Sequence, residues 1–420
     1  MSSSANCKRQ PAITAASAGM PPLASMYADL LQLVGWRLLS GDFSDYVRFR
    51  AVCWHWRSST DSPSGRGIVD ARFRPRRWMM LPDSHGLHPR DGKKRFFNLS
   101  LGSFICCRVP LLQDYTNLCT VEGLLLLQRP TDDEDSTTVR LLHPFTGDVA
   151  KFPPITYHTI CLALTGYRLR DGHRRHNLLT SSVTAALSVS ADGVATIMIM
   201  LSDVSHVLFA TTEDKQWRFS AWSLCPKWGT VSSQGKLYVL QNLKSDDDDD
   251  NEGELRILQI DPPQHEAMPG FTRSSFPAPK VITVCPSTEL RRPFNLVECD
   301  SEVLLIGYNH AVISKRVMVY RVDDLVLGSV VPLTSIRGNA LLIDIPRSLS
   351  VGSKAMPLIM GDTVVRRDPM CDKSLEQYHL GTATWSSRAA GCDEPPAADG
   401  PCLCNLLHHI YGACHCAVTR

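Results

Sequence analysis

The sequence lacks the long apolar runs that would place it in a membrane. No stretch approaches the roughly 18 consecutive apolar residues that a transmembrane helix needs. The first 24 residues are small and mostly polar, and they contain no apolar core of a signal peptide. We therefore expect a disordered leader over residues 1–24, no membrane partner, and a protein of the cytoplasm, the nucleus or both.

The common catalytic motifs are also missing. The chain has no GxGxxG, no phosphate-binding GxxxxGK[ST], no GxSxG and no HExxH. Its carboxylates are spread through turns, where Asp is favoured for backbone reasons, and no pairing of them is visible. The sequence therefore predicts a protein that is not an enzyme, has no catalytic residues and needs no cofactor.

Charge of one sign is not in excess. Lys and Arg total 44 and Asp and Glu total 42, which leaves a net charge of +2. That balance gives no argument for a nucleic-acid partner. The basic piece RFRPRRW, Arg72 to Trp78, is interpreted as a connector whose arginine stems cover the adjoining domain.

Cysteine is plentiful, but its pattern does not indicate a disulfide scaffold. The count of fifteen is odd and the spacings are irregular, so reduced thiols are expected. Residues 386–420 form a Cys/His-containing tail whose CxC pairs offer a zinc site as the minor alternative to a short helix: Cys402, Cys404, Cys414 and Cys416. The usual zinc knuckle is CxxC, so our prediction is no metal.

Residues 25–60 predict a small helical module. One apolar stripe at helical spacing comprises Leu30, Leu31, Val34 and Leu38. After Ser40-Gly41, Asp42 is placed to cap a second helix and Asp45 adds charge to its first turn. The second stripe comprises Phe43, Tyr46, Phe49, Cys53 and Trp56. A module as short as residues 25–60 rarely sustains its own hydrophobic core. At least one of the two stripes therefore needs a partner to pack against.

After a linker with the first strands (61–94), residues 95–385 predict an all-β domain. Short runs rich in Val, Ile, Leu and Tyr alternate with turn residues, and no helical pattern interrupts them. Aligned starts of second strands recur every 50–67 residues, at Gly123, Ala185, Gly235, Glu302 and Gly361. Four-stranded units of this length are typical of β-propeller blades, and Arg72 to Leu112 are candidates for a further unit. The sequence leaves the number of blades open.

Two features of the β domain have structural explanations. Trp217 and Trp228 precede a strand and are interpreted as packing residues between blades. The acidic run Asp246 to Asp250 repels itself and is interpreted as the tip of a long hairpin.

The helical module resembles an F-box. The matching residues are Asp29-Leu30-Leu31, Leu38, Asp42-Phe43, Arg50-Ala51-Val52-Cys53 and Trp56-Arg57, whereas Met26-Tyr27 stands where Leu-Pro is usual. The resemblance implies docking on a SKP-type adaptor and, through it, a cullin. It implies these adaptor-binding residues: Leu30, Leu31, Val34, Leu38, Asp42, Phe43, Val52, Cys53 and Trp56.

The β domain carries a second resemblance, from about Arg74 to Tyr411. KRFFNLSLG, GLLLL, VRLLHPFTGDVAKFPP and GNALLIDIPRSLSVGSKAMP are similar to the plant F-box-associated family called domain of unknown function 295. That resemblance implies a propeller-like domain and leaves the bound target open.

Three hypotheses follow. The first is a substrate-recognition subunit of an SCF-type E3 ubiquitin ligase, with F-box-like helices on the adaptor and the propeller on an unknown protein target. The second is a propeller interaction protein that enters no ligase, because its F-box start is irregular. The third is a propeller enzyme with a site in the central channel, which no cluster of His, Asp or Glu supports.

Overall fold

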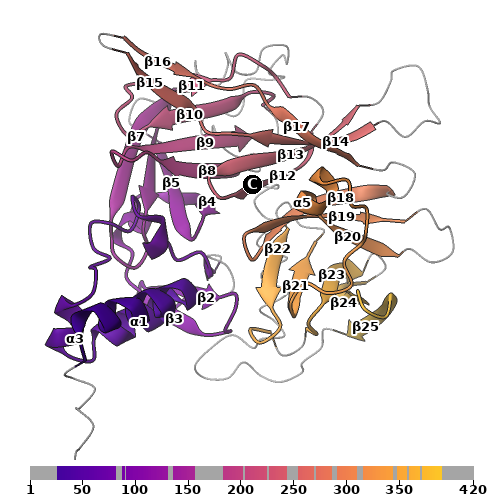
Figure 1. Ribbon diagram of the computed structural model, residues 1–420, viewed down its shortest axis with the longest axis horizontal. Coiled ribbons are helices and arrows are strands. Elements are labelled where there is room, and N and C mark those ends of the chain that lie inside the picture. The colour runs from indigo at the N-terminus through magenta and orange to yellow at the C-terminus, as the bar shows by residue number, and fades with distance from the viewer. Residues whose placement is uncertain are drawn as a thin grey trace, which may run out of the picture. The chain divides into compact units, whose positions relative to one another are not determined.

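The computed structural model describes residues 26–81, 88–89, 91–130, 136–156, 183–201, 204–224, 227–243, 254–268, 271–285, 291–309, 316–343, 348–356, 359–368 and 371–389 (Figure 1). They fall into two compact units that divide between Ser62 and Pro63. We call them the helical unit and the propeller unit. Among these residues, no helix is both long and apolar enough to span a membrane.

The helical unit contains α1 (Ala28–Gly41), α2 (Phe43–Arg50) and α3 (Trp54–Ser58). The predicted cap is confirmed, because the Asp42 side chain accepts a hydrogen bond from the Ser44 amide at 2.8 Å. The prediction that the second helix continues to Trp56 was wrong. Cys53 is extended (φ −159°, ψ 168°) and its sulfur accepts from the Trp56 amide at 3.5 Å, so a new helix starts there.

The helical unit is held together at the crossing of α1 and α2. A Cβ on Gly35 would lie 3.1 Å from the Tyr46 ring and 3.2 Å from the Thr60 methyl group, so glycine permits the close approach. The Tyr46 hydroxyl donates to the Asp61 carbonyl at 2.6 Å. Arg50 donates to the Thr60 hydroxyl at 2.8 Å and to the Asp61 carbonyl at 2.6 Å. These bonds fasten the chain after α3 to α2.

The propeller unit has six blades, which confirms the predicted fold class of short N-terminal helices followed by an all-β propeller (Figure 1). The first three blades are β1 (Trp78–Met80), β2 (Lys94–Asn98) and β3 (Phe104–Cys107); β4 (Thr116–Val121), β5 (Leu124–Pro130), β6 (Ser136–Leu142) and β7 (Val149–Thr156); and β8 (Val183–Val189), β9 (Ala195–Leu201), β10 (Val207–Thr211) and β11 (Arg218–Phe219). Short 3₁₀ turns at Ala71–Phe73 and Pro110–Gln113 precede the first two blades.

The other three blades complete the ring. They are β12 (Lys227–Ser233), β13 (Lys236–Leu243), β14 (Glu254–Ile260) and β17 (Lys280–Cys285), with the separate hairpin β15 (Gln264–Met268) and β16 (Phe271–Ser275); β18 (Arg291–Cys299), β19 (Glu302–Tyr308) and β20 (Val317–Arg321), followed by α5 (Val322–Val326); and β21 (Asn339–Leu342), β22 (Leu349–Gly352), β23 (Thr363–Asp368), β24 (Cys371–His379) and β25 (Thr384–Ala389). All neighbouring strands within the sheets are antiparallel except β21 and β23.

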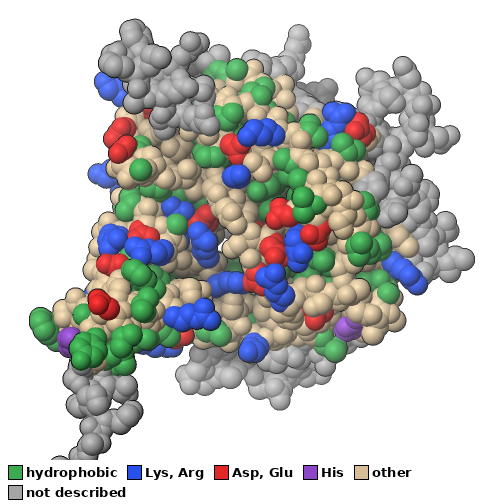
Figure 2. Space-filling view, viewed as in Figure 1, with side chains coloured by type: hydrophobic (Ala, Val, Ile, Leu, Met, Phe, Trp, Pro, Cys, Tyr) green, Lys and Arg blue, Asp and Glu red, His purple; other side chains and the backbone are tan. Residues whose placement is uncertain are grey.

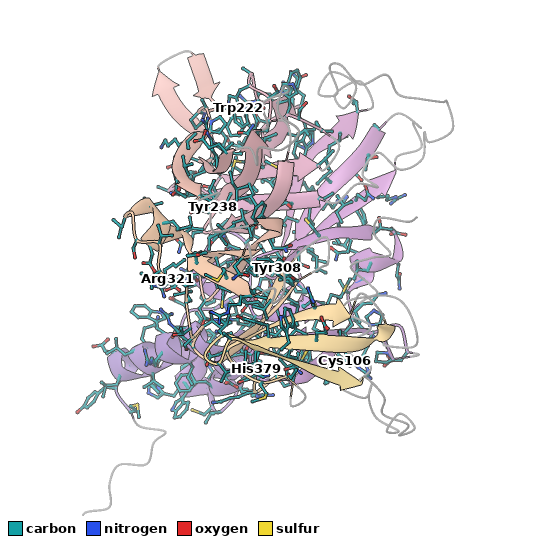
Figure 3. All side chains as sticks on the ribbon, turned by 90° about the vertical axis from the view of Figure 1, so that its right-hand side faces the viewer. Cys106, Trp222, Tyr238, Tyr308, Arg321 and His379 are labelled. Atoms are coloured by element: carbon teal, nitrogen blue, oxygen red, sulfur yellow. The ribbon has the colours of Figure 1, made fainter. Side chains whose placement is uncertain are left out.

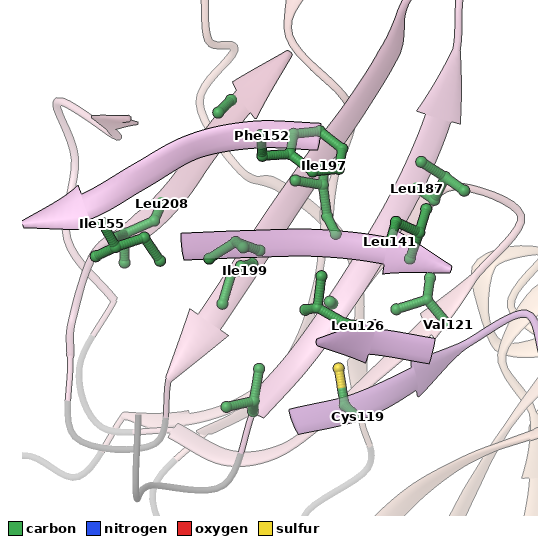
Figure 4. Packing of buried hydrophobic residues seen from close by; sticks show 14 of the residues in the cluster. Cys119, Val121, Leu126, Leu141, Phe152, Ile155, Leu187, Ile197, Ile199 and Leu208 are labelled. Carbon is green, nitrogen blue, oxygen red and sulfur yellow. The ribbon is translucent and has the colours of Figure 1, made fainter. Parts of the chain in front are cut away.

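The core lies between the blades, because alternate residues of a strand face opposite neighbours. In β5, Leu124 and Leu126 pack against the third blade, whereas Leu125 and Leu127 pack against the first. Figure 4 shows Leu126 among the residues of the cluster between the second and third blades. The same alternation divides β9, β19 and β21 between two clusters each. Strands buried on both faces therefore read as continuous apolar runs such as GLLLL.

Polar and aromatic side chains add to this packing. Trp217 is buried between the second and third blades and donates to the Pro153 carbonyl at 2.6 Å, as the packing interpretation requires. The side chain of Trp228 lies outside the described residues. Arg366 donates to the Tyr308 hydroxyl at 3.1 Å and lies 4.2 Å from the Trp385 ring centroid, which joins the fifth and sixth blades. Tyr308 is labelled in Figure 3.

The ring closes by side-chain packing between its first and last blades. Leu81 and Phe97 share a buried cluster with Ala340, Met356 and Val365. The Gly352 amide donates to the Leu99 carbonyl at 2.7 Å. Among the described strands, each blade is one continuous stretch of chain, so no sheet contains strands from both ends of the domain.

The repeat predicted from sequence is correct at three of its five anchors. Gly123 and Gly235 are the last residues of tight turns that lead into second strands, and Glu302 begins a second strand. The two residues of each glycine turn have positive φ: 50° and 84° at Glu122-Gly123, and 51° and 75° at Gln234-Gly235. The assignment was wrong at Ala185, which lies within the first strand of its blade, and at Gly361, which precedes the third strand of the sixth. The additional blade comes from the stretch Arg72 to Leu112, the candidate for it.

Candidate functional site

The helical unit exposes eight large apolar side chains. We call them the helical apolar surface: Tyr27, Leu30, Leu33, Val34, Trp36, Val47, Val52 and Trp54. Figure 2 shows hydrophobic side chains gathered over this unit. Leu30, Leu33 and Val34 lie at helical spacing on the outer side of α1. Gathered exposed apolar side chains of this kind mark a candidate protein-binding site.

The nine residues predicted to bind the adaptor do not all lie on that surface. Leu30, Val34 and Val52 are exposed by 41–61%, whereas Leu38, Cys53 and Trp56 are half-buried. Leu31, Asp42 and Phe43 are buried. Asp42 caps α2, and Leu31 faces inward with Leu39 two turns later. The stripe predicted on the first helix is therefore divided between an exposed face with Leu30 and Val34 and a buried face with Leu31. The contacts with an adaptor stay a prediction.

The sequence reasoning missed five residues of the helical apolar surface: Tyr27, Leu33, Trp36, Val47 and Trp54. Tyr27 is 81% exposed and Trp54 is 80% exposed, more than any predicted contact residue. Leu33 had a usable signal, because it completes the i, i+3, i+4 set with Leu30 and Val34. Trp54 had none, since its exposure depends on the break between α2 and α3.

The irregular start of the module is held in place by α3. A ring nitrogen of His55 bonds to the Met26 carbonyl at 2.9 Å, immediately before Tyr27. Tyr27 occupies the N-cap of α1 without a side-chain capping bond. The segment that departs from the F-box pattern is thus fastened to α3 within the same unit.

A second candidate site is the central channel of the propeller unit. A cavity of about 320 Å³ is lined by residues from the innermost strand of all six blades, β1, β4, β8, β12, β18 and β22. Its lining combines the hydroxyls of Thr120, Thr184, Thr230, Ser232, Ser348 and Ser350 with charged side chains such as Glu122, Glu298 and Asp300 and with apolar residues such as Trp78, Met79 and Leu99. The channel therefore holds polar and charged groups in a domain whose core is otherwise apolar.

Ion-paired side chains form part of the channel wall. Arg74 and Arg76 lie 2.6 Å and 3.2 Å from the Glu122 carboxylate. Arg77 pairs with Asp300, which also accepts from the Asn339 amide at 2.8 Å. Burial pushes the pKa of Asp300 up, but the Arg77 and Asn339 contacts outweigh it and leave that pKa below its ordinary value. Figure 2 shows acidic and basic side chains together across the middle of this face.

The HPFTGD segment, one of the pieces that carry the second resemblance, is an internal anchor. His143 Nδ1 accepts from the Thr146 amide at 3.0 Å, so Nε2 carries the proton and donates to the Phe73 carbonyl at 3.0 Å. The Asp148 carboxylate accepts from the amides of Gly65 and Gly67 at 2.8 Å and 2.9 Å. Burial lowers the pKa of His143. This motif fixes the entry of the chain into the propeller.

The predicted zinc alternative lies outside the described residues. That applies to Cys402, Cys404, Cys414 and Cys416, and also to the acidic run Asp246 to Asp250. Within the part of the chain that the structure describes, no group of three or more His, Cys, Asp or Glu is placed to hold a metal ion.

Comparison with known proteins gives one family match. The family model described as KIB1-4 beta-propeller matches residues 96–381, well over half of the chain. No curated protein sequence matches.

Solved structures give low similarity. A chain of a nidogen/laminin complex has 11% identity and a TM-score of 0.29, and the match covers 74% of this chain and 88% of that one. The β-propeller domain of the Trilobed protease from Pyrococcus furiosus has 10% identity, a TM-score of 0.28 and 68% coverage of each chain. A chain from a study of two prolyl endopeptidases has 13% identity, a TM-score of 0.29, and coverage of 77% and 52%. Scores this low carry no argument about function.

Proposed function

The chain belongs to the KIB1-4 beta-propeller family, and we propose that it is the non-catalytic substrate-recognition subunit of an SCF-type E3 ubiquitin ligase. In this proposal the F-box-like helical unit binds a SKP-type adaptor and, through it, a cullin. The propeller unit binds the protein to be ubiquitinated. In this proposal the protein acts in the cytoplasm, the nucleus or both.

The helical apolar surface carries the proposal. A unit this small has packed Leu31, Phe43, Tyr46 and Phe49 inside and still exposes eight apolar side chains. Fully burying an apolar side chain of Val, Leu or Phe size stabilises by about 1.5–3 kcal/mol, so covering several of them supplies the free energy of a stable protein contact. The F-box resemblance names the partner class that would cover them.

The propeller unit contributes binding and no bond chemistry in this proposal. A subunit that holds a target on one side and a ligase scaffold on the other raises the local concentration of the target at the ubiquitin-loaded enzyme. Six rigid blades suit that role, because the loops between their strands can vary without disturbing the core. The identity of the target is left to experiment.

The test uses exposed residues so that folding is not disturbed. Leu30→Asp together with Val34→Asp places two charges on the helical apolar surface, at positions 49% and 41% exposed. We expect capture of a SKP-type adaptor by the full chain to fall about 100-fold or more, because two apolar contacts become desolvated charges. Circular dichroism and the melting temperature should stay as in the parent protein. Leu327→Asp, at an 83% exposed position of the propeller unit, is the matched control and should bind normally.

Equal adaptor capture by the double variant and the parent would refute this assignment of the docking surface. If the parent protein captures neither adaptor nor cullin, the chain is an interaction propeller outside any ligase. Leu31→Asp is unsuitable as a probe, because Leu31 is fully buried and its loss would unfold the helical unit.

A further inference from the structure

The channel wall is formed by the innermost strands of the blades. Leu296 and Glu298 of β18 line the cavity, as does Asp300 immediately after that strand, so alternate residues of this segment face it. Thr230 and Ser232 of β12, Ser350 of β22 and Ser348 immediately before β22 also line it. Residues more than a hundred positions apart in the sequence thus share one small space.

The arginines that line the channel already have partners. Arg77 pairs with Asp300, and Arg76 shares the Glu122 carboxylate with Arg74. The side chain of Arg74 is 4% exposed, so this network belongs to the wall itself. It leaves no guanidinium of the wall without a carboxylate.

Glu298 differs from the other carboxylates of the wall. Among the described residues it has no ion-pair partner, although its side chain is exposed to the channel. One of its oxygens accepts from the Ser301 amide at 2.8 Å. Burial raises the pKa of Glu298, as does the charge of Asp300, and the Ser301 amide bond and the charges of Arg77 and Arg76 only partly oppose that effect. The carboxylate therefore lies at the channel without an ion pair to any described residue.

The nearby hydroxyls favour a ligand that donates hydrogen bonds. Ser348 donates to the Asn295 side-chain oxygen at 3.3 Å and Ser350 donates to the Cys299 sulfur at 3.1 Å. Thr184 and Thr230 are bonded to each other at 2.7 Å. Because the hydroxyl protons of Ser348 and Ser350 are engaged in the wall, the lone pairs of these two oxygens remain to accept from a ligand.

We propose that the propeller channel binds a primary ammonium group, with Glu298 as its counter-ion and hydroxyl oxygens of the wall as further acceptors. An ammonium group offers three donors and no acceptor, which matches a wall with one unpaired carboxylate and lone pairs. An anion would face Glu298 inside the cavity, and a neutral alcohol would form no charge-assisted hydrogen bond with it.

The size of the cavity limits what carries the ammonium group. About 320 Å³ is at the small end of ligand pockets, so it admits an unbranched alkylammonium chain and no folded structure. A free small amine and a lysine or amino terminus of a bound polypeptide supply the same chemistry. The site does not depend on whether the helical unit binds an adaptor.

Three probes of equal length test the charge preference on the full chain. They are n-pentylamine, which is protonated at pH 7.5, its neutral analogue n-pentanol, and the anion valerate. We expect titration calorimetry to give binding of pentylamine at least tenfold tighter than that of either analogue, because a charge-assisted hydrogen bond is lost in both.

Two variants locate the binding. Glu298→Gln keeps an oxygen to accept from the Ser301 amide but removes the charge, and it should lose the preference for pentylamine by at least tenfold. Glu213→Gln removes a charge from the exposed turn after β10, away from the channel wall, and should bind as the parent does. Unchanged melting temperatures show that both variants are folded.

Further probes identify the source of the ammonium group. Nα-acetyl-lysine methylamide binding as tightly as pentylamine supports a polypeptide lysine, alanine amide doing so supports an amino terminus, and weaker binding of both supports a free small amine. Equal binding of pentanol and pentylamine, retained preference in Glu298→Gln, or no binding of pentylamine at all would each overturn the proposal.

Discussion

The helical unit and the propeller unit treat apolar side chains in opposite ways. The propeller unit buries them in six clusters, one between each pair of neighbouring blades, and places polar and charged side chains among those that line its central channel. The helical unit buries one side of its helices and exposes the other, with Tyr27 and Trp54 at least 80% exposed. In a ring, every blade has two neighbouring blades that cover its apolar faces, whereas three helices offer too little surface to cover one another completely. The incomplete unit is therefore where a permanent partner is expected.

The largest effect is expected for truncating an apolar side chain between blades. Leu126 is fully buried between the second and third blades, so Leu126→Ala should lower the free energy of unfolding of the propeller unit by about 2–5 kcal/mol. Chemical denaturation measures the change. Leu33→Ala removes the same atoms from the helical apolar surface, at a position 58% exposed, and should change stability by less than about 0.5 kcal/mol. Similar losses for the two variants would contradict the contrast between the units.

A smaller effect is expected for loosening the helical unit. Arg50→Met removes the bonds to Thr60 and Asp61, and hydrogen bonds from charged groups contribute about 1.5–3 kcal/mol. Amide hydrogen exchange in α1 and α2 should speed up tenfold or more, while β-strand amides of the propeller unit stay protected.

Arg48→Met on the same helix is the control. Its side chain is 72% exposed and pairs with Asp45 at 3.0 Å, an exposed ion pair of about 0–1 kcal/mol. Equal acceleration of exchange by the two variants would show that Arg50 is not the residue that holds the unit.

The smallest effect concerns the anchor of the propeller unit. Because the pKa of His143 in the folded state is lower than in the unfolded chain, the unfolded state alone takes up a proton as the pH falls below about 6.5. Stability should therefore decrease from pH 7 towards pH 5, by at most about 1.4 kcal/mol per pH unit from this group. His143→Gln should flatten that slope, and His379→Gln, whose side chain bonds to Ser386, should not. Chemical denaturation at pH 7 and at pH 5 measures this change in the free energy of unfolding for the parent protein and both variants.

Local features of the fold were predictable from sequence, and long-range ones were not. Asp42 was predictable as a cap because it precedes a helix by one residue and bonds two residues ahead. The division of Leu30 from Leu31 was not, because adjacent leucines on a helix look alike until the crossing at Gly35 decides which is inside. Likewise, Ala185 looked like a second strand because first and second strands of a blade are both apolar on two faces.

The channel had no signal in the sequence. Its wall combines side chains that lie between Arg77 and Ser350 in the sequence. Each of the strands that contribute them looks, taken alone, like the edge strand of any blade. Glu298 stands out only when six strands converge and the nearby arginines are matched with other carboxylates. The alternation of β18 predicts which side chains share a face, but the ring decides that the face is a channel.

Closure of the ring by its first and last blades has a consequence for synthesis of the protein. Leu81 and Phe97 leave the ribosome early, but their cover comes from Ala340, Val365 and other late residues. Until translation has passed those positions, one face of the first blade stays open to chaperones and to aggregation. A message that ends before β21 would yield five blades with two unprotected apolar faces, which quality-control systems recognise. The ring of blades can therefore close only after the whole β domain has been translated.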